Sequence, residues 1–162
     1  MPLGTPAYKD NSPIVSATDR CNMVKLAIKP FDYMSLSTIE TDRPGNTYTA
    51  DTLAQIYDSY KKIYFIIGAD SLLYIQDWYH PEYICSHCHL LCANRDNNSA
   101  SVLIDQKHFL ADKYGAVIDF IDVPELPYSS TDIRKKVAMG LSVKEDVGEE
   151  VEEYIKSRKL YV

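Results

Sequence analysis

The segment SSTDIR, residues 129–134, brings hydroxyl groups and a guanidinium to the start of one expected helix. Its hydroxyl residues offer Oγ atoms beside backbone N–H groups that a first helical turn leaves unpaired; they are Ser129, Ser130 and Thr131. Arg134 lies one turn further along, on the same side. Such a cluster is a ready anion site for which a polyphosphate is an apt ligand. An ordinary N-cap followed by a solvent-exposed arginine explains the same residues.

A second group of polar residues follows the apolar run IYFIIG, residues 63–68. Gly68 lets a ligand approach the backbone closely, and Asp70 can cap the next helix or accept a hydrogen bond from a ligand. Trp78 can stack on a flat ring, although a lone Trp is more often packed in the core or on the surface.

Two further segments offer groups that could bind anions. In RPGNTYTADT the backbone N–H groups of Thr47 and Tyr48 could bind a carboxylate, although a plain helix-entry turn explains the same residues. Lys9 and Arg95 are isolated cations, and most such residues are only solvated. Arg95, with Asn94, follows an expected strand at its C-terminal end, where parallel sheets place ligands.

The segment YICSHCHLLCANR, residues 83–95, holds three of the chain's four cysteines. On a strand, Cys88 and Cys92 would lie roughly 13 Å apart, too far to share one metal ion at thiolate bonding distance. There is also no second C-x2-C pair of the kind that zinc sites use. The segment is therefore predicted to be a buried strand, and no metal site is expected.

Strands and helices are expected to alternate along the chain. Periodicity predicts helices over 16–28, 49–62, 69–79, 101–114, 129–140 and 148–160, and strands over 33–41, 63–68, 87–93 and 116–123. This alternation predicts one α/β domain over residues 1–162, a parallel sheet with helices on both faces. Ligands bind beyond the C-terminal ends of such strands, so the turns at 68–71 and 129–131 are predicted to face one crevice.

Composition narrows the class of protein. The chain has 162 residues, 46% of them apolar, and a net charge of −6, which is typical of a globular domain that does not bind nucleic acid or anionic membranes nonspecifically. No stretch approaches the roughly 20 apolar residues that span a bilayer. The N-terminus lacks the pattern of a signal peptide, and four cysteines suit a reducing cytoplasm. We therefore expect a cytoplasmic protein with free thiols.

Taken together, these segments resemble one family. RPGNTYTADTL, IIGADSLLYIQDWYHPEYI, LLCANR and YSSTDIRKKVAMGLSVKEDVGEEVEEYIKSRKLY look like the motifs of bacterial nicotinate-mononucleotide adenylyltransferases, in the same order. The resemblance runs from about Gly4 to the last residue. It implies a Rossmann-like nucleotidyltransferase fold. It also implies adenylyl transfer from ATP, with Mg²⁺, to nicotinate mononucleotide, which gives nicotinate adenine dinucleotide and pyrophosphate in NAD biosynthesis.

The resemblance implies a role for each matched residue. A nicotinate mononucleotide site would be made of Thr47, Tyr48, Gly68, Ala69, Asp70 and Trp78. The first four would hold the nicotinate carboxylate, Trp78 would stack near the pyridine ring, and Asp70 would bind ribose or orient the nucleotide. The ATP phosphates would be held by Ser129, Ser130, Thr131 and Arg134, with Arg95 nearby. Lys9 would face phosphate and, with Arg134, is implied to be catalytic.

One family motif has no counterpart in this sequence. The family begins with a G-x-F-D-P-x-H-x-G-H segment, so a first β-α unit of roughly 30 residues is expected to be missing. Its histidines would sit at the α-phosphorus, and we therefore expect weak or no activity. Two alternatives stay open: a non-catalytic nucleotide-binding remnant, and a related nucleotidyltransferase with another acceptor such as pantetheine phosphate. A homo-oligomer is also open.

Overall fold

The computed structural model describes residues 1–6, 15–60, 62–94, 100–124 and 128–162. The chain divides into two compact units: unit 1 is Met1–Thr47 with Pro127–Val162, and unit 2 is Tyr48–Leu126. The prediction of one domain over residues 1–162 stays a prediction.

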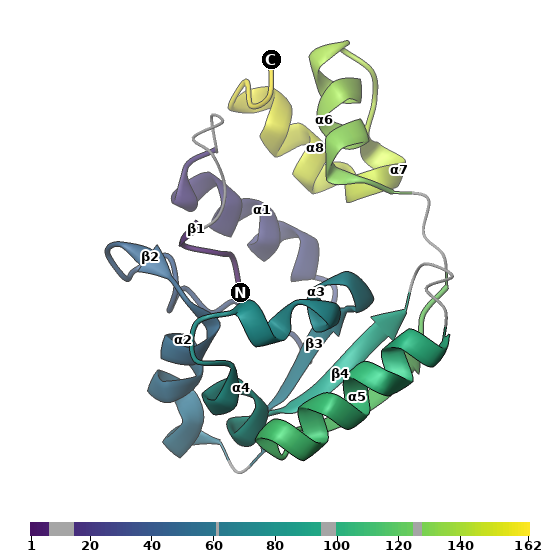
Figure 1. Ribbon diagram of the computed structural model, residues 1–162. Coiled ribbons are helices and arrows are strands. Elements are labelled where there is room, and N and C mark those ends of the chain that lie inside the picture. The colour runs from purple at the N-terminus through teal and green to yellow at the C-terminus, as the bar shows by residue number, and fades with distance from the viewer. Residues whose placement is uncertain (7–14, 61, 95–99, 125–127) are drawn as a thin grey trace. The chain divides into compact units, whose positions relative to one another are not determined.

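Unit 2 is built on a parallel three-stranded sheet. Strands β3 (Tyr64–Gly68), β4 (His89–Asn94) and β5 (Val117–Asp122) pair in the order β3-β4-β5. The helices of this unit are α2 (Thr49–Ile56), α3 (Ala69–Leu73), α4 (Pro81–His87) and α5 (Ala100–Tyr114), with 3-10 turns η1 (Tyr57–Ser59) and η2 (Ile75–Asp77). In Figure 1, α5 runs alongside β4. The predicted parallel α/β architecture is confirmed.

The core of unit 2 lies between the sheet and these helices. Ile67, Leu90 and Ile118 share one face of the sheet and are almost fully buried, together with side chains from all four helices. On the opposite face, Ile66 and Val117 are 66% and 54% exposed. A continuous apolar run such as residues 63–68 is typical of a strand buried on both faces, and that expectation is wrong here.

Unit 1 joins the two ends of the described chain. Short strands β1 (Thr5–Pro6) and β2 (Asn46–Thr47) pair in parallel, and the helices are α1 (Ala17–Ile28), α6 (Ser130–Ala138), α7 (Lys144–Val147) and α8 (Glu149–Ser157). The buried side chains of α6 to α8 form one group, here called the C-terminal cluster, which consists of Val137, Val143, Val151 and Ile155. Met23 and Leu26 of α1 pack against it.

A polar network joins the start of α1 to α8. Ser16 is the N-cap of α1: its Oγ accepts the N–H of Asp19 at 3.0 Å and donates to the Asp19 carboxylate at 2.6 Å. The other carboxylate oxygen of Asp19 accepts hydrogen bonds from Tyr154 at 2.8 Å and Arg158 at 3.1 Å. The hydrogen bonds from Ser16 and Tyr154 hold the pKa of Asp19 below its usual range. The carboxylate is therefore a charged link between the two helices.

Close packing of β1 against β2 requires a glycine at position 4. A Cβ on Gly4 would lie 2.2 Å from Thr47 Oγ1 and 2.3 Å from the carbonyl oxygen of Glu40. We expect Gly4→Ala to lower the free energy of unfolding by about 1–3 kcal/mol, because the backbone oxygen cannot move aside. Urea denaturation measures this change. The matched control is Gly68→Ala, where a Cβ meets nothing within 4 Å, and equal destabilisation of both variants would contradict the steric explanation.

Two predicted elements differ from the structure: the strand over 33–41 and the helix over 49–62. Residues 33–41 are not a strand: Tyr33 is 76% exposed, and Thr38 instead makes a turn with Asp42, whose N–H donates to the Thr38 carbonyl at 2.9 Å. The helix predicted over 49–62 ends earlier, with α2 at Ile56, and its N-cap is Tyr48. Short polar side chains compete well for local backbone groups when no neighbouring strand is present.

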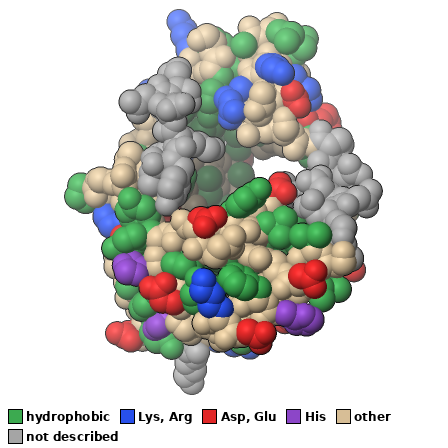
Figure 2. Space-filling model, viewed as in Figure 1, with side chains coloured by type: hydrophobic (Ala, Val, Ile, Leu, Met, Phe, Trp, Pro, Cys, Tyr) green, Lys and Arg blue, Asp and Glu red, His purple; other side chains and the backbone are tan. Residues whose placement is uncertain are grey.

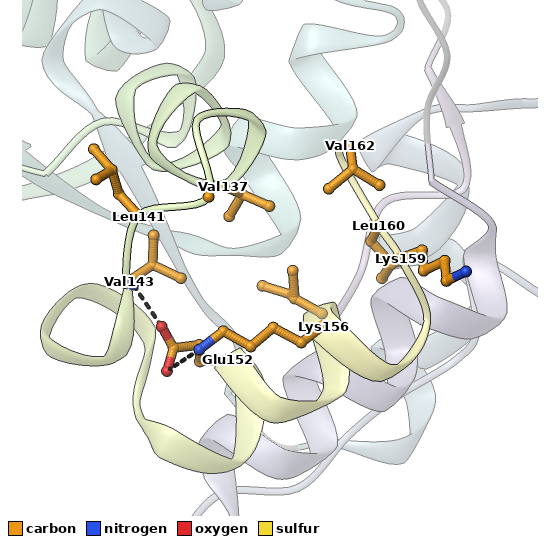
Figure 3. Close-up of a pocket in the computed structure, with 10 residues that line it drawn as sticks. Val137, Leu141, Val143, Glu152, Lys156, Lys159, Leu160 and Val162 are labelled. Carbon is orange, nitrogen blue, oxygen red and sulfur yellow. Dashed lines mark hydrogen bonds and ion pairs between the residues drawn. The ribbon is translucent and has the colours of Figure 1, made fainter.

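The acidic run from Glu145 to Glu153 is typical of a solvated helix face in the sequence, but the structure does not solvate all of it. Glu152 is 6% exposed and lies in the wall of a cavity of about 200 Å³ (Figure 3). Its carboxylate accepts hydrogen bonds from Ser142 Oγ at 2.7 Å and the Val143 N–H at 2.8 Å, and pairs with Lys156 Nζ at 3.0 Å. These groups, Ser142 first, lower the pKa of Glu152 to about 2.

Protonation of Glu152 should therefore contribute to unfolding in acid. Because the folded pKa of about 2 lies below the usual value near 4.5, the stabilisation is fully present above about pH 4.5 and is lost as the pH falls toward 2. We expect the thermal midpoint to fall over this range, and Glu152→Gln to flatten the fall. Thermal melts monitored by circular dichroism measure it. The control is the exposed neighbour Glu153→Gln, and an unchanged acid profile for Glu152→Gln would contradict the assignment.

Candidate active site

The start of α6 combines a helix cap with unpaired donors. Ser129 is the N-cap, and its Oγ accepts the Asp132 N–H at 3.0 Å and donates to the Asp132 carboxylate at 2.6 Å. The N–H groups of Ser130 and Thr131 point out of the first turn, where a helix offers them no acceptor. Arg134 Nη2 donates to Thr131 Oγ1 at 3.4 Å, and both side chains are exposed. Capping accounts for the Ser129 side chain. The N–H groups of Ser130 and Thr131 and the Arg134 guanidinium are suited to bind an anion.

Asp132 places a negative charge beside these donors. The hydrogen bond from Ser129 lowers the pKa of this carboxyl, and Lys135 Nζ lies 3.6 Å from its second oxygen. The carboxylate is therefore ionised at neutral pH and partly neutralised by the lysine. A phosphate held by Arg134 would be a neighbour of this pair.

The C-terminal ends of β3 and β4 border a cavity of about 460 Å³, lined by Ile66, Ile67, Gly68, Ala69, Asp70, Ser71 and Ala93. Gly68 ends β3 and is exposed, and Asp70 is exposed in the first turn of α3. The cavity therefore brings together the predicted residues of the glycine–aspartate turn, at the sheet edge where parallel α/β proteins bind ligands.

Two pairs of aromatic rings pack together in unit 2. Trp78 is half-buried, and its ring meets the edge of Phe65 at 6.3 Å between centroids. Tyr48 packs on Tyr79, with centroids 4.6 Å apart. The stacking role of Trp78 stays a prediction.

Thr47, the last residue of β2, holds a buried hydroxyl that has no hydrogen-bond partner among the residues that the structure describes. The residue is 7% exposed, and its Oγ1 makes no hydrogen bond within the described ranges. A buried polar atom without a partner is costly, by about 1–3 kcal/mol. Such an atom in a native structure needs an explanation, and a bound ligand is one.

The cysteine-rich segment is a strand only in its second half, so the predicted buried strand is confirmed for Cys92 and wrong for Cys85, which lies in a helix. Cys85 lies in α4, Cys88 caps that helix and Cys92 lies in β4, and all three are buried free thiols. Burial raises the pKa of Cys85 to about 11 and that of Cys88 to about 12, so both stay protonated. Across the residues that the structure describes, no three His, Cys, Asp or Glu side chains are grouped to hold a metal ion.

The predicted site residues are divided between the two units. Unit 1 holds Thr47, Ser129, Ser130, Thr131 and Arg134, and unit 2 holds Tyr48, Gly68, Ala69, Asp70 and Trp78. Lys9 and Arg95 lie outside the described residues. The single crevice predicted for the turns at 68–71 and 129–131 stays a prediction.

The surface carries dispersed charges. On the side shown in Figure 2, acidic side chains are spread over the helices of unit 2. Of the helices in the described ranges, none is long and apolar enough to cross a bilayer.

Known proteins match this chain closely. The cytidylyltransferase-like family model matches residues 3–136. A probable nicotinate-nucleotide adenylyltransferase of Lachnoclostridium phytofermentans is 35% identical over 164 residues, which cover 100% of this chain and 82% of the relative. One of Moorella thermoacetica, with the same name, is 37% identical, with 99% and 76% covered.

Solved structures show the same fold. Plasmodium falciparum nicotinic acid mononucleotide adenylyltransferase complexed with NaAD superposes with a TM-score of 0.71 at 17% identity, over 94% of this chain and 78% of that one. A second structure of that enzyme, complexed with APC, gives 0.62 at 18% identity, over 89% and 75%. With the relatives above, these matches place the chain in the nicotinate-nucleotide adenylyltransferase family of cytidylyltransferase-like proteins.

Proposed function

We propose that this protein transfers the adenylyl group of ATP to nicotinate mononucleotide (NaMN), giving nicotinate adenine dinucleotide (NaAD) and pyrophosphate. A phosphate oxygen of NaMN attacks the α-phosphorus of ATP, and the bond from that phosphorus to the pyrophosphate oxygen breaks. No protein nucleophile is needed, so the protein's task is to align the two nucleotides and to stabilise charge.

The support that carries the proposal is the similarity to nicotinate-nucleotide adenylyltransferases over the whole chain. It includes every described segment that holds a predicted site residue. The donors of α6 suit the phosphates of ATP, because a helix N-terminus and a guanidinium both favour anions. The cavity at Gly68–Ser71 suits the NaMN side. The unpaired hydroxyl of Thr47 suits a carboxylate, which accepts hydrogen bonds only.

ATP is expected to bind together with Mg²⁺, which neutralises part of the triphosphate charge. Mg²⁺ is usually held by substrate phosphates and one or two carboxylates, without a protein cage. Asp132, in the first turn of α6, is the carboxylate that would stand beside the phosphates. Ser129 donates a hydrogen bond to this carboxylate and Lys135 pairs with it. Its position is therefore fixed before ATP binds.

The decisive experiment offers the full chain ATP and Mg²⁺ with one of three acceptors: NaMN, nicotinamide mononucleotide or pantetheine phosphate. Chromatography detects the adenylylated product, and a coupled assay detects pyrophosphate. We expect NaAD from NaMN in preference to either other product. Product from pantetheine phosphate alone would identify a different acceptor. Calorimetric binding of NaMN and ATP without turnover would identify a non-catalytic nucleotide-binding protein, and binding of neither would end the proposal.

A further inference from the structure

Two glutamine side chains bind the end of helix α3 in unit 2. Gln106 Nε2 donates hydrogen bonds to the Leu72 carbonyl at 3.0 Å and to Gln76 Oε1 at 2.8 Å. Gln76 Nε2 donates in turn to the Leu73 carbonyl at 2.9 Å. The last carbonyls of a helix have no acceptor role within it, and α3 ends at Leu73. The two amides, here called the glutamine pair, therefore hold the end of α3.

The backbone that carries Gln106 is anchored in the core of unit 2. Leu103 and Leu110, on the same helix α5, are 2% and 0% exposed. They lie three positions before and four positions after Gln106, and such positions share one face of a helix. Gln106 is thus a half-buried amide on an otherwise apolar helix face, where a polar group needs hydrogen-bond partners. It finds them on α3 and on Gln76.

The glutamine pair holds two short elements that could not hold themselves. Helix α3 has five residues, and a single helical turn is unstable alone because nucleation is unfavourable. Gln76 lies in the next element, the 3-10 turn η2, whose Ile75 carbonyl accepts the Trp78 N–H at 3.1 Å. One pair of amides therefore ties the chain between the turn at Gly68–Ser71 and Trp78 to α5.

We propose that Gln106 is a positioning residue of the NaMN site, which sets the affinity for NaMN by fixing α3 and η2 without contacting the nucleotide. The inference rests on the proposed function, because it assumes that the cavity lined by Gly68, Asp70 and Ser71 receives NaMN. Binding groups that are already oriented lose less entropy when the ligand arrives. The effect should be selective, because the groups proposed to hold the ATP phosphates lie on α6 in unit 1.

Two substitutions at Gln106 test this role by calorimetry with NaMN and, separately, with ATP. Gln106→Met keeps the length of the side chain and removes its donors. Gln106→Glu keeps the shape, but a carboxylate only accepts hydrogen bonds and would face two acceptor oxygens. We expect NaMN to bind about tenfold more weakly to Gln106→Met, the equivalent of one lost hydrogen bond, and at least as weakly to Gln106→Glu. ATP affinity should stay close to that of the wild type.

Hydrogen exchange checks the first link of the inference. The backbone amides of α3 should exchange faster in both Gln106 variants than in the wild type, because the end of the helix opens more often. Unchanged exchange of these amides would overturn the inference, since Gln106 would then not hold α3.

Gln76→Met tests the other half of the glutamine pair, and it also serves if a Gln106 variant fails to fold. It removes the donor to Leu73 and the acceptor of Gln106, so NaMN affinity should fall here too. In the double variant the loss should be smaller than the product of the two single losses, because the two amides share one hydrogen bond.

Ile118→Val is the matched control for general loosening of unit 2. Ile118 is 2% exposed in β5, outside α3 and η2, so the variant should lower the thermal midpoint and leave NaMN affinity unchanged. An equal loss of NaMN affinity in this control would overturn the inference. So would an equal loss of ATP affinity in Gln106→Met. If Gln106→Met and Gln76→Met bind NaMN as tightly as the wild type, the inference is overturned and the proposed function stands. A wild-type chain that binds no NaMN would overturn both.

Discussion

Replacing Arg134 by alanine should reduce kcat/KM for NaAD formation by about 10²–10³-fold, the usual cost of removing one preorganised donor to the developing charge. Arg134 is exposed in the first turns of α6, and its only hydrogen bond within the described ranges, to Thr131 at 3.4 Å, is long. Little therefore competes with a phosphate for its guanidinium. Pyrophosphate release measured over a range of ATP concentrations gives kcat and KM separately.

Two further variants distinguish the loss of this particular donor from a general loss of positive charge. Arg134→Lys keeps the charge but loses the planar fork of donors, so its activity should lie between those of the wild type and Arg134→Ala. Lys135→Ala removes a neighbouring exposed cation that is paired with Asp132, and should stay close to the wild type. If Lys135→Ala lost as much as Arg134→Ala, the effect would be one of net charge, and full activity of Arg134→Ala would remove this residue from the site.

Elements whose signals are local were predictable from the sequence. Ser16 and Ser129 each cap a helix through a partner three residues on, a contact that the sequence spacing itself encodes. The apolar runs at 63–68 and 116–123 became neighbours of a third strand in one parallel sheet, because apolar β-rich segments separated by helices have few other ways to bury their surface. The turn at Ser129–Thr131, which is predicted to bind phosphate, likewise lies within one turn of α6.

Features that depend on distant partners were not predictable. Residues 33–41 alternate like a strand, but a strand exists only where another strand pairs with it. Glu152 looked solvated because its partners Ser142 and Val143 lie before a separate helix, α7, that the sequence did not reveal.

We expect Thr47→Val to lower the affinity for NaMN without lowering the free energy of unfolding. The hydroxyl of Thr47 is buried and unpaired within the described ranges, so its removal should leave the free energy of unfolding equal or higher, by up to about 1–3 kcal/mol. If the same hydroxyl donates to the nicotinate carboxylate, affinity for NaMN should fall by about 10–100-fold, as for a hydrogen bond to a charged group. Calorimetry and urea denaturation measure the two effects on one preparation.

Thr52→Val is the matched control, because Thr52 is also buried but its Oγ1 donates to the Tyr48 carbonyl at 3.3 Å. Losing that hydrogen bond should lower stability and leave NaMN affinity nearly unchanged, the reverse of the Thr47→Val result. Nicotinamide mononucleotide provides the second comparison, since it has no carboxylate and should respond little to Thr47→Val. Equal weakening of both mononucleotides would show that the Thr47 hydroxyl does not recognise the carboxylate. A donor for the acid form would then have to come from the backbone of Tyr48 or Ala69.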